Sequence, residues 1–198
     1  MNTQLNIIVA AIDEANARDS TLVEADGKLH PRAFLYGKRM STVLDKFMPD
    51  APETLLIAAR AQHIERWVIP RTSYPKGRIA YLKWRKDLQQ NHAKRSGEHM
   101  PVAGYGEVDI EKVGALLRKE RLKYDPLTQT LEDVICLVFL QYEAPAFIVL
   151  HDENKERDIL VKTARKMSPL GLAEAGKLTL DARLARLLTE ALATRLAD

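Results

Sequence analysis

The amino-acid sequence predicts an all-α protein, and three observations support that fold class. Apolar residues recur at helical spacing through most of the 198-residue chain, helix-capping signals stand at the starts of several segments, and no segment shows the alternating pattern of a strand hairpin. The length suits one domain. We therefore expect a compact, single-domain helical bundle over residues 1–198, with a buried central helix near residues 126–143.

The first half of the chain is expected to form five helices. Residues 4–18 place their apolar side chains on one stripe, which is typical of a surface helix that faces a core. A turn at Asp26-Gly27 leads to Pro31, which suits the first position of a helix that ends near Phe47. The three helices that follow are expected at residues 53–68, 78–94 and 108–122.

The second half begins with the clearest capping signal in the chain. Asp125-Pro126 is an N-cap followed by a first-turn proline, and the helix over residues 126–143 then becomes apolar almost all round. That pattern is typical of a helix buried on every side. A short helix is expected from Pro145 to about His151. Two further helices are expected at residues 152–167 and 181–196, with a short turn capped by Ser168-Pro169 between them.

Cysteine content and hydropathy limit the compartment in which the protein works. The lone Cys136, inside the apolar run LEDVICLVFL, excludes an intrachain disulfide, and we expect a reduced, cytoplasmic compartment. The N-terminal residues lack the basic region and cleavage site of a signal peptide. No run of about 18 apolar residues occurs, so we expect neither a transmembrane helix nor a membrane partner.

Charge is distributed unevenly along the chain. The formal net charge is +3, yet residues 60–95 hold ten Lys and Arg against two acids, Glu65 and Asp87. This segment therefore carries +8 and the rest of the chain −5. Such a segment suits a surface that receives phosphates or carboxylates, and the alternative is a solvated basic face without a ligand.

Two consecutive expected helices place histidine, arginine and aromatic residues near one another. The helix over residues 53–68 carries His63, Arg66 and Trp67 near its end, and the helix over residues 78–94 carries a similar set. Consecutive helices joined by a short loop are usually spatial neighbours. Guanidinium groups bind phosphate in a bidentate manner and aromatic rings can cover a ligand. The sequence thus predicts a site for an anionic ligand with Arg66, Trp67, Arg71, Tyr74, Tyr81, Trp84 and Arg85 as ligand-binding residues.

Purely structural roles remain open for the same residues. A single histidine on a helix is commonly a hydrogen-bonded structural residue, and an arginine can stack on an indole with no ligand present. Glu132 and Asp133, just before the most apolar segment, need partners once they are buried. They can belong to a salt-bridge lattice with the arginines. The alternative is a catalytic site in which His63, His92 and Asp133 hold a divalent metal ion and Glu132 serves as a base.

Three blocks carry a resemblance to a known family: RAQHIERWVIPRTSYPKGRIAYLKWRKDLQQNHA, LEDVICLVFL and KTARKMSPLG. With these blocks the chain resembles, over nearly its whole length, the bacterial and fungal proteins grouped as domain of unknown function 4202. That family carries no established activity. The resemblance implies emphasis on a set of residues that includes those already gathered: His63, Arg66, Trp67, Pro70, Arg71, Tyr74, Pro75, Tyr81, Trp84, Arg85, His92, Glu132 and Asp133.

A second resemblance is to the HD-type metal phosphohydrolases, all-α enzymes whose ligands come in the order His, His-Asp, Asp. The corresponding residues here would be His63, His92 and Asp133. Ala93 follows His92 where the pattern has an aspartate, so one negative charge that a divalent cation would need is missing. This departure puts both metal binding and the hydrolase activity in doubt, unless Glu132 or Asp87 substitutes.

Two classes of function follow from the sequence. The first is an enzyme, a metal-dependent hydrolase of a phosphorylated small molecule or nucleotide, with His63, His92, Glu132 and Asp133 as its catalytic groups. The alternative is a protein without chemistry: an RNA-binding module, for example for tRNA, that uses the same basic segment, or a structural or partner-binding helical protein.

Overall fold

The computed structural model describes residues 3–122, 124–148 and 152–197, and nearly all of its regular structure is helical. The prediction of an all-α fold class is therefore confirmed. The chain divides into two compact units, residues 1–121 (unit 1) and residues 122–198 (unit 2). The prediction of a single domain stays a prediction. No described helix is long and apolar enough to cross a membrane.

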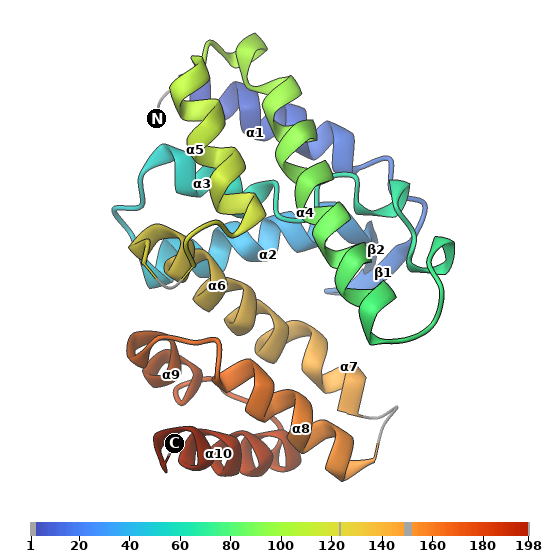
Figure 1. Ribbon diagram of the computed structural model, residues 1–198, viewed down its shortest axis with the longest axis vertical. Coiled ribbons are helices and arrows are strands. Elements are labelled where there is room, and N and C mark those ends of the chain that lie inside the picture. Colours follow the sequence, from blue (N-terminus) through green and yellow to red (C-terminus); the bar gives the residue numbers. More distant parts are fainter. Residues whose placement is uncertain (1–2, 123, 149–151, 198) are drawn as a thin grey trace. The chain divides into compact units, whose positions relative to one another are not determined.

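Unit 1 contains five α-helices and a small hairpin (Figure 1). Its elements are α1 (Thr3–Asn16), β1 (Leu22–Ala25), β2 (Lys28–Pro31), α2 (Arg32–Phe47), α3 (Glu53–Arg60), α4 (Arg78–His99) and α5 (Glu107–Arg118). The core side chains come from all five helices. Helix α4 differs from the others, because its buried face mixes Trp84, Leu88 and Ala93 with the polar His92 and Ser96. Helices α4 and α5 lie side by side.

The expectation that the chain contains no strand hairpin is wrong. Strands β1 and β2 pair antiparallel with Leu22 opposite Pro31, and the two-residue turn between them is Asp26-Gly27. Both turn residues have positive φ, 51° and 70°, as a type I′ turn requires. The turn signal was present in the sequence, but each strand has only four residues, which is too short for an alternating pattern to stand out.

Two helices of unit 1 differ in length from the prediction. Helix α3 ends at Arg60 rather than at Val68, and residues 61–65 form turns before a short 3-10 helix at Arg66–Val68. Helix α4 runs to His99 and so contains Ser96 and Gly97, where the sequence suggested an end. A long helix tolerates one glycine when its other positions are well packed.

Unit 2 begins with the helix that the sequence predicts most clearly. Its elements are α6 (Pro126–Val138), a π-helical turn (Phe139–Glu143), α7 (Ala144–Ile148), α8 (Glu153–Ala164), α9 (Pro169–Ala175) and α10 (Ala182–Ala197). Asp125 caps α6 by accepting the amide hydrogen of Thr128 at 3.1 Å. The buried helix near residues 126–143 is confirmed. Its π turn precedes Pro145, which lacks the N–H needed to continue regular α-helical bonding. The expected helix end at His151 lies outside the described residues.

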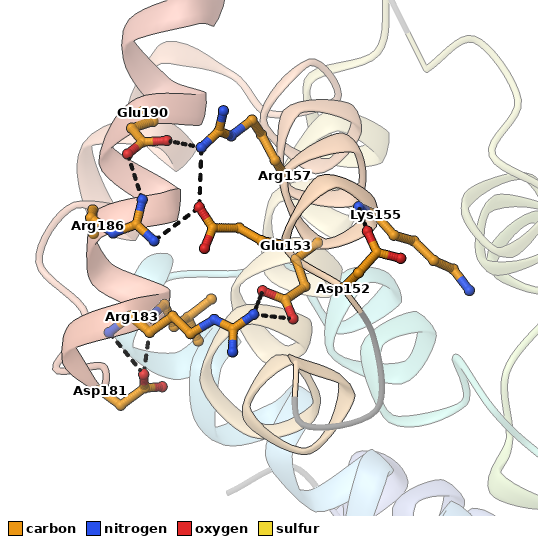
Figure 2. Close-up of polar contacts among 10 residues, drawn as sticks. Asp152, Glu153, Lys155, Arg157, Asp181, Arg183, Arg186 and Glu190 are labelled. Atoms are coloured by element: carbon orange, nitrogen blue, oxygen red, sulfur yellow. Dashed lines mark hydrogen bonds and ion pairs between the residues drawn. The ribbon is translucent and has the colours of Figure 1, made fainter.

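Ion pairs join α8 to α10 in unit 2 (Figure 2). Arg183 donates to both carboxylate oxygens of Glu156 at 2.9 and 2.8 Å, and the Glu156 side chain is fully buried. Nearer the surface, Arg186 bridges Glu153 at 3.1 Å and Glu190 at 2.9 Å. The Arg183–Glu156 pair differs energetically from its exposed neighbours, because Glu156 is fully buried although Arg183 is half-exposed, and removing the arginine leaves an uncompensated carboxylate out of water.

We predict that Arg183→Met lowers the free energy of unfolding by about 3 kcal/mol, because the buried carboxylate of Glu156 loses its counterion. Adding Glu156→Gln to this variant should restore most of the loss. The measurement is urea denaturation followed by far-UV circular dichroism. Arg157→Met, which removes only half-exposed ion pairs, is the matched control and should cost less than about 1 kcal/mol. Equal losses for Arg183→Met and Arg157→Met would contradict the distinction.

Candidate anion-binding site

A polar turn after α3 determines where the site residues of unit 1 point. Glu65 adopts a left-handed conformation, with φ 47° and ψ 37°, which is uncommon for a residue with a side chain. Its amide donates to the Oδ1 atom of Asn16 at 3.1 Å, and its carboxylate forms an ion pair with Arg95 of α4. The turn is therefore held by one contact from helix α1 and one from helix α4.

His63 lies in a stack of rings. Its imidazole packs on the phenol ring of Tyr36 from α2, with the centroids 3.6 Å apart and the planes 19° from parallel. The ring centroid of His92, from α4, lies 6.1 Å from that of His63, and the two rings are tilted relative to each other. Burial, helped by the positive charge of Arg66, lowers the pKa of His63 well below its usual value. The imidazole is therefore neutral at pH 7 although its side chain keeps some accessible surface.

His92 is buried and has one hydrogen-bond partner. Its Nδ1 atom lies 2.8 Å from the carbonyl oxygen of Ile64. A carbonyl only accepts, so we assign the proton of the neutral ring to Nδ1, which leaves Nε2 as an acceptor. Nε2 is buried and meets no donor among the described residues. Burial lowers the pKa of His92 to about 4, and the Ile64 carbonyl opposes that shift.

Trp84 anchors two arginines of the loop before α4. The indole N–H donates to the carbonyl oxygen of Ile69 at 2.9 Å, which fixes the ring against the loop. The guanidinium carbons of Arg66 and Arg71 lie 4.9 and 6.0 Å from the ring centroid, within the range of a cation–π interaction. Arg71 also donates to the carbonyl of Tyr74 at 3.0 Å, so it helps to close its own loop. The positive charge of Arg66 acts on both imidazoles and lowers the pKa of each.

The remaining predicted ligand-binding residues lie farther along α4 and its loop. Tyr81 packs beside Trp84 with centroids 5.8 Å apart, and Arg85 donates to the Tyr81 hydroxyl at 3.4 Å. Tyr74 donates to Asp87 at 2.7 Å and is thereby tied to the middle of α4. Trp67 is half-buried, and its ring has no hydrogen bond or ring contact with any described residue. These residues do not stack on the two imidazoles.

The positive charge of residues 60–95 is partly neutralised within the fold. At least four of its ten cations form ion pairs with carboxylates of residues that the structure describes: Arg60 with Asp13, Lys83 with Asp87, Lys94 with Glu98, and Arg95 with Glu65 and Glu98. Asp13 and Glu98 lie outside the segment, so a count along the sequence misses them. The balance of +8 therefore overstates the charge that this surface offers to a ligand.

Asp133 lies in α6 of unit 2, and its carboxylate holds the residue before the start of α9. Its carboxylate accepts the amide hydrogen of Ser168 at 2.8 Å and the Ser168 hydroxyl hydrogen at 2.5 Å. Gln129 donates to the same carboxylate at 3.0 Å. Gly171 lies so close that a Cβ atom there would be 2.6 Å from the Asp133 Oδ1 atom. This arrangement explains the block KTARKMSPLG: Ser168 caps α9, Pro169 is its first residue and Gly171 makes room for the acid.

The proposed metal ligands come from both units, so the structure leaves their grouping as a prediction. His63 and His92 belong to unit 1, whereas Asp133 and the buried Glu132 belong to unit 2. Among the residues that the structure describes, no three His, Cys, Asp or Glu side chains are grouped so that they could hold a metal ion. Two imidazoles alone supply no negative charge for a divalent cation. No metal-dependent chemistry is therefore assigned to these residues.

Sequence reasoning missed two residues that shape the site. Tyr36, which stacks on His63, lies four residues before Met40 on the inward stripe of α2, so its burial could have been predicted but not its partner. Asn16, which holds the Glu65 amide, ends α1 and is separated from Glu65 by 49 residues. No local signal connects these positions.

Together these features define an all-α protein whose first unit places two neutral imidazoles beside an arginine stacked on tryptophan. A family model described as Domain of unknown function (DUF4202) matches residues 6–188, and the chain belongs to this family. The predicted resemblance to that family is thus confirmed. The resemblance to HD-type phosphohydrolases is not confirmed and stays a hypothesis. No curated protein and no solved structure matches the chain.

We predict that Gly171→Ala lowers the free energy of unfolding by about 2 kcal/mol, because its methyl group would overlap the Asp133 carboxylate, which Ser168 holds in place. The control is Gly176→Ala at the end of α9, where a Cβ atom would lie 3.5 Å from its nearest neighbour. That variant should change stability by less than about 0.5 kcal/mol. Urea denaturation measures both, and similar losses would contradict a specific clash at Gly171.

We also predict that unit 1 loses stability as the pH falls from about 6.5 to about 4. His92 has a pKa of about 4 in the folded protein and an ordinary value near 6.5 when unfolded, so the unfolded chain binds the proton first. The loss should reach roughly 3 kcal/mol. Urea denaturation at several pH values, followed by tryptophan fluorescence, reports on unit 1, which contains both tryptophans.

The variant His92→Gln should make this pH profile shallower, because one of the two imidazoles with a lowered pKa is gone and only His63 remains. His30→Gln in β2 is the control and should keep the wild-type slope. If His92→Gln and the wild type lose stability in parallel between pH 6.5 and 4, His92 is not the group responsible.

Proposed function

We propose that unit 1 binds an anionic small molecule, a phosphorylated metabolite or a nucleotide, at the imidazole cluster formed by Tyr36, His63, Arg66 and His92. The observation that carries the proposal is the placement of two neutral imidazoles, 6.1 Å apart, beside the positive charge of Arg66. The cluster combines one cation with hydrogen-bonding groups that carry no negative charge. Such a combination favours an anion over a cation.

Each member of the cluster offers a different contact to a phosphate ester. The Arg66 guanidinium, whose central carbon lies over the Trp84 ring at 4.9 Å from its centroid, can donate two parallel hydrogen bonds to phosphate oxygens. The buried Nε2 atom of His92 can accept a hydrogen bond from a ligand hydroxyl or from water. His63, neutral and half-buried, can donate or accept according to its tautomer. Tyr36 holds the His63 ring in a fixed plane for that contact.

The lowered pKa values favour binding over acid–base catalysis. A general base works best when its pKa lies near the working pH, and burial has moved both imidazoles well below 7. Their main use at neutral pH is then as uncharged hydrogen-bonding groups. Hydrolysis of the bound ester, with these imidazoles as catalytic groups, is the enzymatic extension of the proposal.

The burial of the cluster favours a small ligand over RNA. His92 is buried and His63 is half-buried, whereas the phosphates of a nucleic acid are usually met by exposed side chains on a convex surface. The exposed cations of the same segment, such as Lys76 and Arg78, lie in the loop and at the start of α4. RNA binding by that surface is the alternative, and salt dependence separates it from the proposal.

The test is isothermal titration calorimetry with AMP and with inorganic phosphate, in buffer that contains EDTA. Arg66→Gln should weaken AMP binding at least about tenfold, as expected for the loss of a charge-assisted hydrogen bond. The control Lys76→Gln, which removes the same charge from an exposed position, should bind as the wild type does. The histidine Cε1–H signals of His63 and His92 should shift on binding in NMR spectra.

Two results would overturn the proposal. One is the absence of saturable binding together with unchanged histidine signals. The other is equal weakening by Arg66→Gln and Lys76→Gln with a steep dependence on salt, because diffuse attraction of a polyanion then explains the affinity. Release of inorganic phosphate from AMP that disappears in His63→Gln would support the enzymatic extension.

A further inference from the structure

A second concave surface lies in unit 1, between the middle of α4 and the end of α5. It is a hollow of about 480 Å³, which falls in the size range of small-molecule sites. Helix α4 lines it with Leu82, Arg85, Lys86, Gln89 and Gln90, and residues at the end of α5 close the other side. Figure 1 shows α4 and α5 running beside each other here. We call it the α4–α5 hollow.

The α5 side of the hollow is a fixed wall. Arg118 donates to Glu111 and to Glu120 at 2.6 Å each, so two carboxylates balance its charge. Its guanidinium covers Gly114, where a Cβ atom would lie 2.7 Å from Nη1. A side chain at position 114 would displace it. Arg118 therefore shapes the hollow without adding a free positive charge, and Glu120 contributes a carboxylate at its edge.

The α4 side supplies two cations that the fold does not neutralise. Lys86 makes no hydrogen bond or ion pair with any residue that the structure describes, and the one side-chain bond of Arg85 is to the Tyr81 hydroxyl at 3.4 Å. The neighbouring Lys83 differs, because Asp87 pairs with it at 2.7 Å. Adjacent positions 85 and 86 therefore carry two positive charges toward one concave surface, which favours a doubly charged anion.

The remaining lining groups suit hydroxyl groups rather than a flat ring. Gln89 and Gln90 both line the hollow, and their amides have no hydrogen-bond partner among the described residues. Each amide can donate and accept, as a hydroxyl group also can, and Glu120 adds an acceptor. Among the described residues that line the hollow, Leu82 is the only large apolar side chain, and none of them has an aromatic ring on which a base could stack.

We propose that the α4–α5 hollow binds a phosphorylated sugar or polyol. Arg85 and Lys86 hold the phosphate, the amides of Gln89 and Gln90 bind hydroxyl groups, and Leu82 covers the carbon chain. This inference goes beyond the proposed function, because the hollow shares no residue with the imidazole cluster. It stands whether or not that cluster binds a ligand.

The test is isothermal titration calorimetry of the 198-residue protein with ribose 5-phosphate, with inorganic phosphate and with ribose. Ribose 5-phosphate should bind at least about tenfold more tightly than inorganic phosphate or ribose, because it uses both halves of the hollow. The double variant Arg85→Ala/Lys86→Ala should weaken its binding by at least tenfold. Gln89→Leu should remove most of the preference over inorganic phosphate.

The matched control is Lys76→Ala/Arg78→Ala, which removes the same charge from the same segment outside the hollow and should leave the affinity unchanged. Because the imidazole cluster is also proposed to bind phosphorylated compounds, the titrations are repeated in Arg66→Gln, which weakens that cluster. Ribose 5-phosphate binding that persists in Arg66→Gln and is lost on adding Arg85→Ala/Lys86→Ala belongs to the hollow, so failure of the cluster and failure of the hollow are distinguishable. Far-UV circular dichroism confirms that each variant is folded. The proposal is overturned if ribose 5-phosphate shows no saturable binding, if inorganic phosphate binds as tightly, or if the two double variants weaken binding equally.

Discussion

The left-handed backbone at Glu65 is the constraint on which the candidate site depends. A residue with a side chain adopts this conformation at an energetic cost, on the order of 1 kcal/mol or more, and so needs support from its surroundings. Asn16 holds the amide of Glu65 and Arg95 holds its carboxylate. With the turn in place, His63 packs against Tyr36 while Arg66 reaches Trp84. A continuous helix would instead have extended about 12 Å farther in a straight line.

The sequence predicts those parts of the fold that depend on neighbouring residues. Asp125-Pro126 and Ser168-Pro169 mark helix starts because the cap and the first helical residue are adjacent in sequence, and both are observed. The end of α3 was not predictable in this way. The partners of Glu65 lie 49 and 30 residues away, and the local pattern at residues 61–68 is that of a continuing helix. A distant side chain overrides the local preference here.

The candidate site shows the same division between local and distant information. The proximity of His63 and His92 was predicted from two consecutive helices, although His63 lies in the turn that follows α3 rather than on the helix itself. The aromatic partner of Arg66 could not be predicted in the same way. Its guanidinium lies over the ring of Trp84 and not over that of its sequence neighbour Trp67. The net charge counted along residues 60–95 was the poorest guide to the charge of the folded surface. Counterions approach the basic segment from other elements, as Asp13 of α1 does for Arg60, and no count along the chain includes them.

The neutral state of the imidazoles is a consequence of both burial and the nearby guanidinium. Burial disfavours the protonated rings, and the positive charge of Arg66 adds to that effect for both. An anion bound beside Arg66 would reverse the second contribution and raise both pKa values toward their usual range. By linkage, proton uptake and anion binding then favour each other.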